Sequence, residues 1–327
     1  MITQLVYDSR KIIFAEASLF FALPTGSNDG HRFLEDAYKK GVRSFVVAHD
    51  IDARALPDSN IIVVQNVSAS FQALAAHHRA QFPIPVISIT GSNGKTVVKE
   101  WLYQLLQRGQ NIVRSPKSYN SQIGVPLSVW QMSGQHTLGI FEAGISQPGE
   151  MENLERLIQP TIGVLTNIGE AHSAGFSSIE EKLQEKLKLF KNAKVLICKK
   201  ELVSQEDLLT PLFTWGFYEG ATVFIKSIQK LKGTTRITFR YAAIEDEVVI
   251  PFTDDASIEN AITCLCVLLY LGKDVQKEKE TFATLHAVDM RLHLLHGING
   301  CTLINDSYSA DFTSLQIALN FLKQQQF

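Results

Sequence analysis

The sequence predicts an α/β protein whose main domain is a parallel sheet covered by helices, and three observations support this. Short apolar strands alternate with amphipathic helices from residue 86 to residue 198, a pattern typical of parallel sheets buried on both faces. A glycine-rich turn at residues 90–96 directly follows one strand and opens a helix. Pro83 and Pro85 separate this region from a smaller α/β unit, because closely spaced prolines favour an extended linker.

The first domain is expected to span residues 1–82. Residues 43–48 and 60–64 are rich in β-branched side chains and predict two strands. A turn-rich segment at 22–30 precedes a helical pattern, and a second helix is predicted over 68–81. These elements describe a small N-terminal α/β domain.

The central domain, residues 83–288, contains the strongest periodic patterns. The helix predicted over 96–108 has apolar residues every three to four positions, which gives it one apolar face. Residues 221–252 lack helical patterns and predict a small antiparallel sheet, and a buried helix is expected over 258–271. The strands expected in the parallel sheet are 86–90, 138–141, 162–166 and 194–198, and the antiparallel strands are 221–225, 235–239 and 247–251.

After Met290 the pattern begins again, with a strand predicted over 301–305 and a helix over 313–323. One strand and one helix bury too little apolar surface to form a core of their own. We therefore expect residues 289–327 to be only the beginning of a third, C-terminal domain, so that the sequence is a fragment of a longer chain.

The overall composition excludes several classes of protein. The 327 residues include 31 Lys and Arg against 33 Asp and Glu, so the chain has no broad positive field for nucleic acid or an anionic membrane. The longest apolar run, 264–271, is far shorter than the roughly 20 residues that span a bilayer. The four cysteines form no C-x-x-C pair. We expect a cytoplasmic protein with no nucleic-acid partner and no membrane insertion.

The turn Thr90–Thr96, of sequence T-G-S-N-G-K-T, predicts a phosphate-binding loop. Its glycines let backbone N–H groups turn toward a phosphate, and the helix that follows adds partial positive charge. Lys95 is suited to neutralise the β- and γ-phosphates of a nucleotide, and the Thr96 hydroxyl to bind Mg²⁺. The alternative is a plain glycine-rich turn with an exposed lysine. The residues expected to bind nucleotide here are Gly91, Ser92, Asn93, Gly94, Lys95 and Thr96.

Further short motifs occur in the order found in one enzyme family. With the short G-x-x-G-K-T spacing, they resemble the Mur ligases, ATP-dependent enzymes that form amide bonds in peptidoglycan precursors. Within that family the likeness is to the type that adds D-alanyl-D-alanine to UDP-N-acetylmuramoyl-tripeptide, and it covers nearly the whole chain. The motifs are Asp8-Ser-Arg10, Leu19–Leu23 and Asp29-Gly-His31 in the first domain, Asn120–Pro126, Glu142-Ala-Gly144, Pro148-Gly-Glu150 and Thr166–His172 in the second, and Met290-Arg-Leu292 and Asn305–Tyr308 in the third.

This resemblance implies a cytoplasmic ligase of peptidoglycan synthesis that uses ATP and Mg²⁺. Its substrates would be UDP-N-acetylmuramoyl-tripeptide and D-Ala-D-Ala. A substrate carboxylate would attack the γ-phosphate of ATP, and the amine of D-Ala-D-Ala would then displace phosphate from the acyl phosphate. The third domain would be Rossmann-like. Residues 305–322 also resemble the ligase half of fusions with alanine racemase, so a fused racemase domain in the full-length protein is a further expectation.

The resemblance also implies a set of metal-binding and catalytic residues. Glu142 would bind Mg²⁺, and His172 would bind a second metal ion. Lys186 lies fourteen residues after His172, where the family has a lysine that reacts with CO₂ and binds Mg²⁺ as a carbamate. Lys182 and Lys188 are competing candidates on the same predicted helix. The expected catalytic residues are Lys95, Glu142, His172 and Lys186, and the expected metal ligands are Thr96, Glu142, His172 and Lys186.

Other matched positions imply contacts with nucleotide and substrate. Asn260 would contact adenine, Arg291 the γ-phosphate and Asp306 the ribose. Ser9 and Arg10 would hold the UDP portion of the substrate, since an arginine suits bidentate contact with pyrophosphate. Without the resemblance, these residues are equally typical of turns, helix starts and surface positions. The expected substrate contacts of the central domain are Asn120 and Gln122.

Three alternative functions remain open from the sequence. Another ligase of the same superfamily would add a single amino acid to a muramyl peptide or a folate. A fragment without most of its third domain would bind nucleotide but not turn over. A P-loop kinase would transfer phosphate to a stable acceptor and would form no acyl phosphate.

Overall fold

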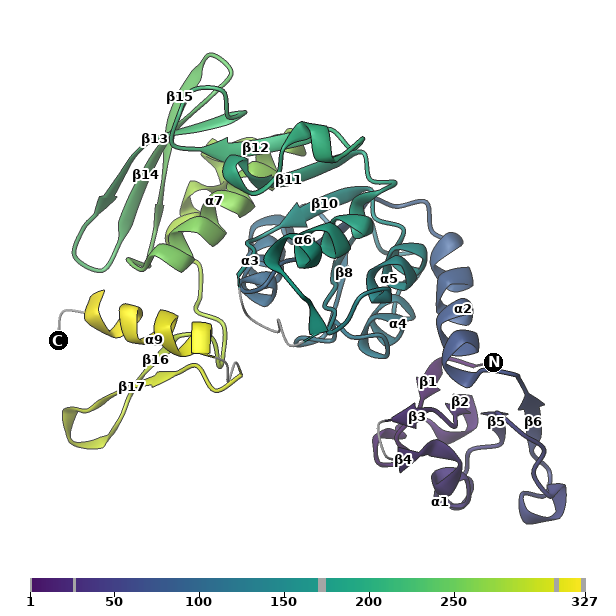
Figure 1. Cartoon of the computed structure of the whole chain (residues 1–327). Helices are drawn as coiled ribbons and strands as arrows, with labels where there is room; N and C mark the ends of the chain where they lie inside the picture. Colours follow the sequence, from purple (N-terminus) through teal and green to yellow (C-terminus); the bar gives the residue numbers. More distant parts are fainter. Residues whose placement is uncertain (1, 26–27, 170–174, 309–311, 325–327) are drawn as a thin grey trace. The chain divides into compact units, whose positions relative to one another are not determined.

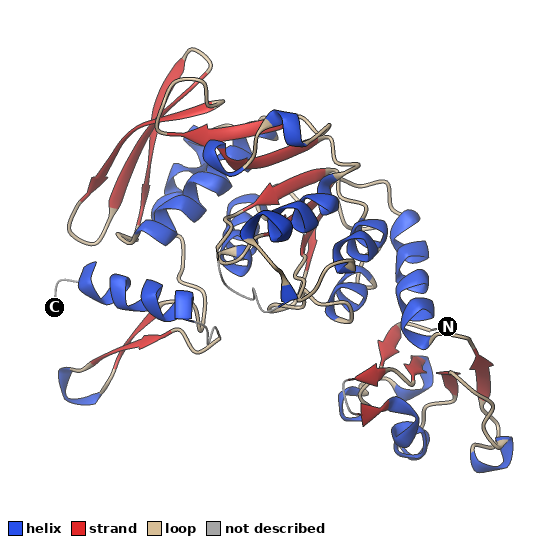
Figure 2. Cartoon of the chain, in the orientation of Figure 1, coloured by secondary structure: helices blue, strands red, loops and turns tan. Residues whose placement is uncertain are grey.

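The computed structural model describes residues 2–25, 28–169, 175–308 and 312–324 (Figure 1). It divides into two compact units, one of residues 1–82 with 126–132 and the other of residues 83–125 with 133–327. Both units combine helices with a parallel sheet, which confirms the predicted α/β fold class (Figure 2). Every helix among the described residues is too short or too polar to cross a bilayer.

The first unit contains a four-stranded parallel sheet. Its strands, in spatial order, are β1 (Gln4–Val6), β2 (Ser18–Phe21), β5 (Ser44–Val47) and β6 (Asn60–Val63). The remaining elements are the short hairpin of β3 (Pro24–Thr25) and β4 (Asn28–Asp29), helix α1 (Leu34–Lys39) and helix α2 (Val67–Ala80). Phe20 and Phe45 are fully buried in its core. Strands β5 and β6 match the two predicted strands, whereas β1 and β2 were not predicted.

The second unit contains a nine-stranded sheet with the spatial order β15-β14-β13-β12-β11-β10-β7-β9-β8. All its neighbouring strands from β12 to β8 pair in parallel. Their bounds are β7 Val86–Thr90, β8 Ile112–Arg114, β9 Leu138–Glu142, β10 Ile162–Leu165, β11 Val195–Lys199 and β12 Leu212–Gly216. The strands predicted at 86–90, 138–141, 162–166 and 194–198 are therefore confirmed, whereas β8 and β12 were not predicted.

The predicted antiparallel strands are present, but they belong to the same sheet. Strand β13 (Val223–Lys230) pairs in parallel with β12 and antiparallel with β14 (Thr235–Tyr241), which in turn pairs with β15 (Ile244–Ile250). Backbone pairing at the β12 edge continues the sheet into this hairpin region. A small antiparallel sheet of its own was predicted because the sequence pattern indicates only local strands, whereas the pairing of β13 with β12 is a contact between distant segments.

The α-helices between β7 and β16 (His293–His296) connect or cover the strands. They are α3 (Lys95–Leu106), α4 (Gly124–Val129), α5 (Glu150–Ile158), α6 (Ile179–Leu187), α7 (Asp255–Tyr270) and α8 (Val275–Ala283), with α4 crossing the boundary between the two units. Helix α7 begins after Asp254, whose side chain accepts a hydrogen bond from the N–H of Ser257. Helices α3 and α7 pack together in the main core, where Trp101 and Leu265 are buried. Helix α8 was not predicted.

The last part of the second unit is a two-stranded hairpin followed by a helix. Strand β16 (His293–His296) pairs antiparallel with β17 (Thr302–Asn305), and α9 (Phe312–Gln324) follows. Strand β17 and helix α9 match the prediction, and β16 is an additional strand. The carboxyl ends of β7, β9 and β10 lie side by side, which is where open α/β sheets bind ligands.

Candidate active site

The glycine-rich turn forms a tight loop between β7 and α3. Gly91 and Gly94 have φ angles of 145° and 82°, which favour glycine because a side chain would be strained there. A methyl group added at Gly91 would collide with the hydroxyl of Thr166, and one at Gly94 would collide with the amide of Asn260. The loop therefore needs glycine at both positions, for its backbone angles and for its close neighbours.

Residues after β10 hold this loop in place. The N–H of Ser92 donates to the carbonyl of Asn167 at 3.0 Å, and the N–H of Asn93 donates to the Asn167 side chain at 2.8 Å. The Thr166 hydroxyl donates to the carbonyl of Asn93 at 2.6 Å. Thr166 and Asn167 belong to the motif at residues 166–172, but their contacts with the loop were not predicted from sequence. Their role depends on β10 lying beside β7.

The side chain of Lys95 folds back onto the phosphate loop that precedes it. Its ammonium donates to the carbonyls of Gly91 at 2.8 Å and Ser92 at 3.0 Å. Burial lowers the pKa of Lys95 to about 8, and the nearby charges of Arg291 and Lys182 act in the same direction, whereas Glu142 opposes them. A bound phosphate would favour the charged form of this side chain.

We expect nucleotide affinity to fall as pH rises through about 8, the pKa of Lys95. Below that pH the ammonium is charged and attracts phosphate, and above it the neutral amine does not. The dissociation constant of ADP, measured calorimetrically from about pH 7 to about pH 9.5, checks this. Lys95→Met should lose the dependence, and a constant wild-type affinity over that range would contradict the assignment.

Glu142 is fully buried at the end of β9, beside the first turn of α3. Its Oε2 accepts a hydrogen bond from the Thr96 hydroxyl at 3.1 Å and lies 3.4 Å from Nδ2 of Asn120. The Thr96 hydroxyl also lies 2.9 Å from Oγ of Ser118 and 3.5 Å from Nη2 of Arg291. The structure thus brings Thr96, Asn120, Glu142 and Arg291 together from four separate chain segments.

The oxygen donors of this cluster suit Mg²⁺. Mg²⁺ prefers oxygen ligands, keeps several waters and is commonly held by one or two protein groups together with substrate phosphates. Thr96 Oγ1 and Glu142 Oε2 provide such a pair next to the phosphate loop. No group of three or more His, Cys, Asp or Glu residues is suited to a metal in the part of the chain that is described. His172, the expected second-metal ligand, lies outside the described residues.

Helix α6 contributes the lysines that compete for the carbamate role. Lys186 is buried, and its Nζ donates to the carbonyl of Gly91 at 3.2 Å. Lys182 is also buried and donates to the carbonyl of Gly169 at 2.6 Å. Lys188 is 42% exposed and pairs with Glu185 at 2.7 Å, away from the loop. The geometry therefore removes Lys188 as a candidate and leaves Lys182 and Lys186.

The pKa of Lys186 lies well below its ordinary value. Burial is the main cause, and the charges of Lys95 and Lys182 add to it. A neutral amine is the form that reacts with CO₂, and a carbamate would replace one of three neighbouring cations with an anion. The environment of Lys186 thus favours the modification expected from the resemblance.

These lysines line a cavity of about 340 Å³, within the range of ligand sites. Its wall also contains Asn120 and Gln122, the expected substrate contacts. Nε2 of Gln122 donates to the carbonyl of Glu150 at the start of α5, which orients the amide. A cavity with several ammonium groups and amides suits a phosphorylated or carboxylated substrate.

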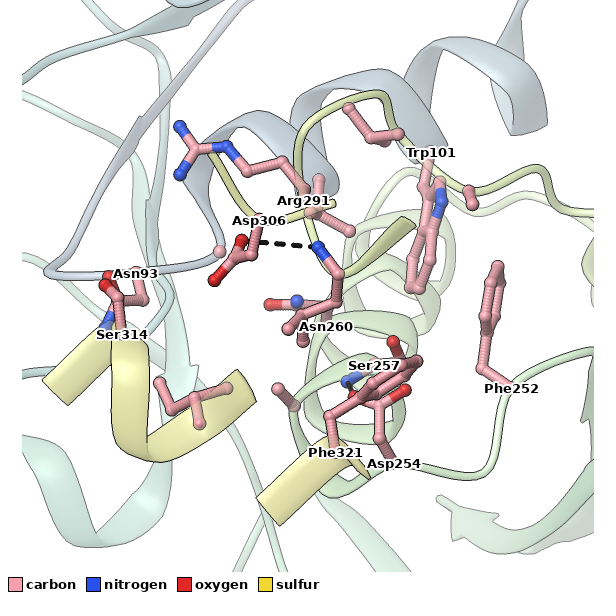
Figure 3. Close-up of a pocket in the computed structure, with 17 residues that line it drawn as sticks. Asn93, Trp101, Phe252, Asp254, Ser257, Asn260, Arg291, Asp306, Ser314 and Phe321 are labelled. Carbon is pink, nitrogen blue, oxygen red and sulfur yellow. Dashed lines mark hydrogen bonds between the residues drawn. The ribbon is translucent and has the colours of Figure 1, made fainter. Parts of the chain in front are cut away.

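A second, smaller pocket is lined in part by Asn93 and Gly94 of the phosphate loop (Figure 3). Asn260, Arg291 and Asp306, the three residues expected to contact nucleotide, all line it together with Asn93 and Gly94 of the loop. Asp306 Oδ1 accepts a hydrogen bond from the N–H of Leu292 at 3.2 Å. The pocket also has aromatic walls, formed by Trp101, Phe252 and Phe321.

Ser9 and Arg10 belong to the first unit. Ser9 is buried in a short turn, whereas the Arg10 side chain is 85% exposed and pairs with Asp8 at 2.9 Å. His31 of the Asp29-Gly-His31 motif is held by Asp29 at 2.6 Å and accepts a hydrogen bond from the N–H of Ala48 at 3.0 Å. An exposed guanidinium after a buried serine is available for a ligand of this unit.

A shortened phosphate loop, an acid at the end of the neighbouring strand β9 and a lysine-lined cavity together form a site suited to a nucleoside triphosphate on a parallel sheet. The sequence profile described as the Mur ligase middle domain matches residues 89–268, more than half of the chain, and the chain belongs to the Mur ligase family.

Individual similar proteins narrow the likeness to one type of ligase within this family. The chain is 29% identical over 321 residues to the UDP-N-acetylmuramoyl-tripeptide–D-alanyl-D-alanine ligase of Bacillus subtilis, covering 95% of this chain and 68% of that protein. It is similar to the crystal structure of MurF from Acinetobacter baumannii, with a TM-score of 0.88, 25% identity and coverage of 98% and 71%. The MurF ligase from Thermotoga maritima in complex with ADP has the same fold, with a TM-score of 0.85, 24% identity and coverage of 99% and 75%.

Proposed function

We propose that this chain is an ATP-dependent ligase that adds D-alanyl-D-alanine to UDP-N-acetylmuramoyl-tripeptide in peptidoglycan synthesis. The observation that carries this is the convergence of the phosphate loop and the lysines of α6 on one cavity, with Glu142 hydrogen-bonded to Thr96 at the start of α3. The named relatives, which match nearly the whole chain, support the choice of substrates. ATP and Mg²⁺ are the cofactors proposed for this site.

The proposed reaction requires a carboxylate and a triphosphate to approach each other. Their negative charges repel, and Lys95, Lys182 and Arg291 supply positive charge where they meet. A substrate carboxylate oxygen attacks the γ-phosphorus and ADP leaves. The amine of D-Ala-D-Ala then attacks the acyl carbon, and inorganic phosphate leaves as the amide forms. Mg²⁺, when held by Thr96 and Glu142, would withdraw charge from the phosphate oxygens.

The other site residues are assigned within this proposal. Asn260 would contact adenine and Asp306 the ribose, because both line the pocket beside the loop. Ser9 and Arg10 would hold the UDP portion in the first unit. Asn120 and Gln122 would contact the peptide end of the substrate, and His172 stays the proposed ligand of a second metal ion.

The proposed place of this reaction is the cytoplasm, where ATP and UDP-linked precursors are available. Free cysteines are consistent with a reducing compartment, and Cys198, Cys264, Cys266 and Cys301 are all free in the structure. A fused alanine racemase domain stays a prediction that rests only on the likeness of residues 305–322.

We expect Lys186 to carry a carbamate in the presence of CO₂, because its pKa is lowered and a carbamate supplies oxygen ligands where an ammonium would repel a metal. Protein equilibrated with ¹³C-bicarbonate should show a carbamate signal by ¹³C NMR. Lys186→Arg should remove the signal, and the exposed-lysine control Lys188→Arg should keep it. A signal lost in Lys182→Arg but kept in Lys186→Arg would move the assignment to Lys182.

The proposed function is tested by measuring ATP hydrolysis and products with defined acceptors. Release of phosphate should require both UDP-muramyl-tripeptide and D-Ala-D-Ala, and mass spectrometry should detect the pentapeptide product. Hydroxylamine should trap the acyl phosphate, which a kinase would not form. Product formed with a single amino acid but not with D-Ala-D-Ala would overturn the substrate assignment.

A further inference from the structure

Helix α3 contains a lysine that the sequence analysis did not single out. Lys99 lies one turn after Lys95, on a part of α3 that faces β9 and the loop after β8, and its side chain is fully buried. A buried ammonium is costly unless oxygen atoms surround it. The oxygen atoms around the Lys99 ammonium therefore indicate its structural role.

The Lys99 ammonium has four oxygen partners in the described structure. It donates to the carbonyl of Ser115 at 2.8 Å and also to the carbonyl of Lys117. It lies 2.9 Å from Oε1 of Glu100 and 3.1 Å from Oε1 of Glu142. The contact with Glu142 is an ion pair by distance, since Oε1 of Glu142 accepts no hydrogen bond from the described residues. Two main-chain carbonyls fix its position, and two carboxylates balance its charge.

The two oxygen atoms of Glu142 therefore face different partners. Oε1 lies against Lys99, whereas Oε2 faces the Thr96 hydroxyl and the Asn120 amide. The main-chain N–H of Glu142 also donates to Oγ of Ser115 at 3.2 Å, so the same loop holds its backbone. Rotating the carboxylate would break the contact with Lys99.

Glu100 is bound on its other side. Its Oε2 lies 3.1 Å from Nε of Arg114, whose guanidinium stacks on Tyr103 with 3.6 Å to the ring centroid. Glu100 thus keeps a cationic partner without Lys99. For Glu142, Lys99 is the one ion pair within 4.0 Å that the described residues show.

We propose that Lys99 is a positioning residue that holds Oε1 of Glu142, so that only Oε2 is presented to the Mg²⁺ of the bound nucleotide. This inference rests on the proposed function, because it takes Glu142 to be a metal ligand. Groups that orient a metal ligand set metal affinity without touching the metal. Lys99 acts through Glu142 in the same way.

The test is the Mg²⁺ dependence of ADP binding in Lys99→Met and Lys99→Gln. Calorimetric titrations of ADP would be run with Mg²⁺ and with EDTA. We expect the variants to need roughly 10- to 100-fold more Mg²⁺ to reach the tight-binding state, as for other lost partners of metal ligands. Affinity for ADP in EDTA should change by less than about twofold, because Lys99 lies away from the phosphate loop carbonyls.

Glu100→Gln is the matched control, since it removes the other carboxylate on the same ammonium and leaves the Lys99–Glu142 contact. It should keep the wild-type Mg²⁺ dependence. An unchanged Mg²⁺ dependence in folded Lys99 variants would overturn the proposal. If both Lys99 variants fail to fold while Glu100→Gln folds, Lys99 is a core residue only, which also overturns it. A wild-type protein whose ADP binding ignores Mg²⁺ would instead contradict the proposed function.

Discussion

Replacing Glu142 with glutamine is expected to remove most ligase activity and to destabilise the fold at the same time. The amide cannot supply a charged oxygen for Mg²⁺ beside Thr96, and loss of such an electrostatic partner costs roughly 10²–10³ in rate. Lys99 would remain buried with Glu100 as its remaining carboxylate. Removing one partner of a buried ion pair lowers the free energy of unfolding by about 3 kcal/mol or more. We expect a loss near about 3 kcal/mol, because the Glu100 carboxylate still balances the charge of Lys99.

The double variant Glu142→Gln with Lys99→Met separates the two effects. It removes both charges of the pair, so the free energy of unfolding, measured by urea denaturation, should recover toward wild type. Activity should stay as low as in Glu142→Gln, because the metal ligand is still missing. If the double variant is no more stable than the single one, the ion pair does not account for the lost stability.

Replacing Lys95 with alanine is expected to reduce kcat/KM by roughly 10²–10³, about the effect of removing one preorganised charge from a phosphate site. The ammonium lies within the phosphate loop and donates to two of its carbonyls, whereas the Lys186 ammonium of α6 donates to only one of them, that of Gly91. The thermal stability of the Lys95→Ala variant, in contrast to its activity, should stay the same or rise. Burial lowers the pKa of Lys95 to about 8. The charged side chain therefore destabilises the folded state near neutral pH, and its removal relieves this.

Two measurements check the Lys95 variant. Steady-state kinetics with both acceptor substrates should show the loss, and thermal unfolding should occur at the wild-type temperature or above it. Lys188→Ala is the control, because Lys188 is partly exposed just after the end of α6 and pairs with Glu185 outside the cavity. Comparable loss in both variants would mean that general charge, and not the position of Lys95, supports the reaction.

The phosphate loop shows what local sequence predicts well. Strand, turn and helix are adjacent in the chain, so the glycine spacing and the apolar periodicity of α3 sufficed to predict β7, the loop and the helix. The strands β13–β15 beyond β12 show where prediction from local sequence fails. Strands β13–β15 were expected as a separate sheet, because the parallel pairing of β13 with β12 leaves no trace in either strand alone.

The candidate site divides in the same way. The motif at residues 142–144 directed attention to Glu142, but nothing in the sequence indicated that Lys99 lies 3.1 Å from it. Lys186 was the predicted carbamate residue from its spacing to His172, and burial separates its two competitors, leaving Lys182 and setting Lys188 aside. The roles of His172 and of a carbamate on Lys186 stay predictions.

The α/β class, the phosphate loop and the order of the motifs were predictable from the amino-acid sequence, because each depends on residues close together in the chain. The folded chain was needed to show which oxygen of Glu142 faces Thr96, which lysines reach the loop, and how Thr166 and Asn167 hold it. These depend on strands and helices from distant segments packing side by side, and burial and charge pairing arise only after that packing.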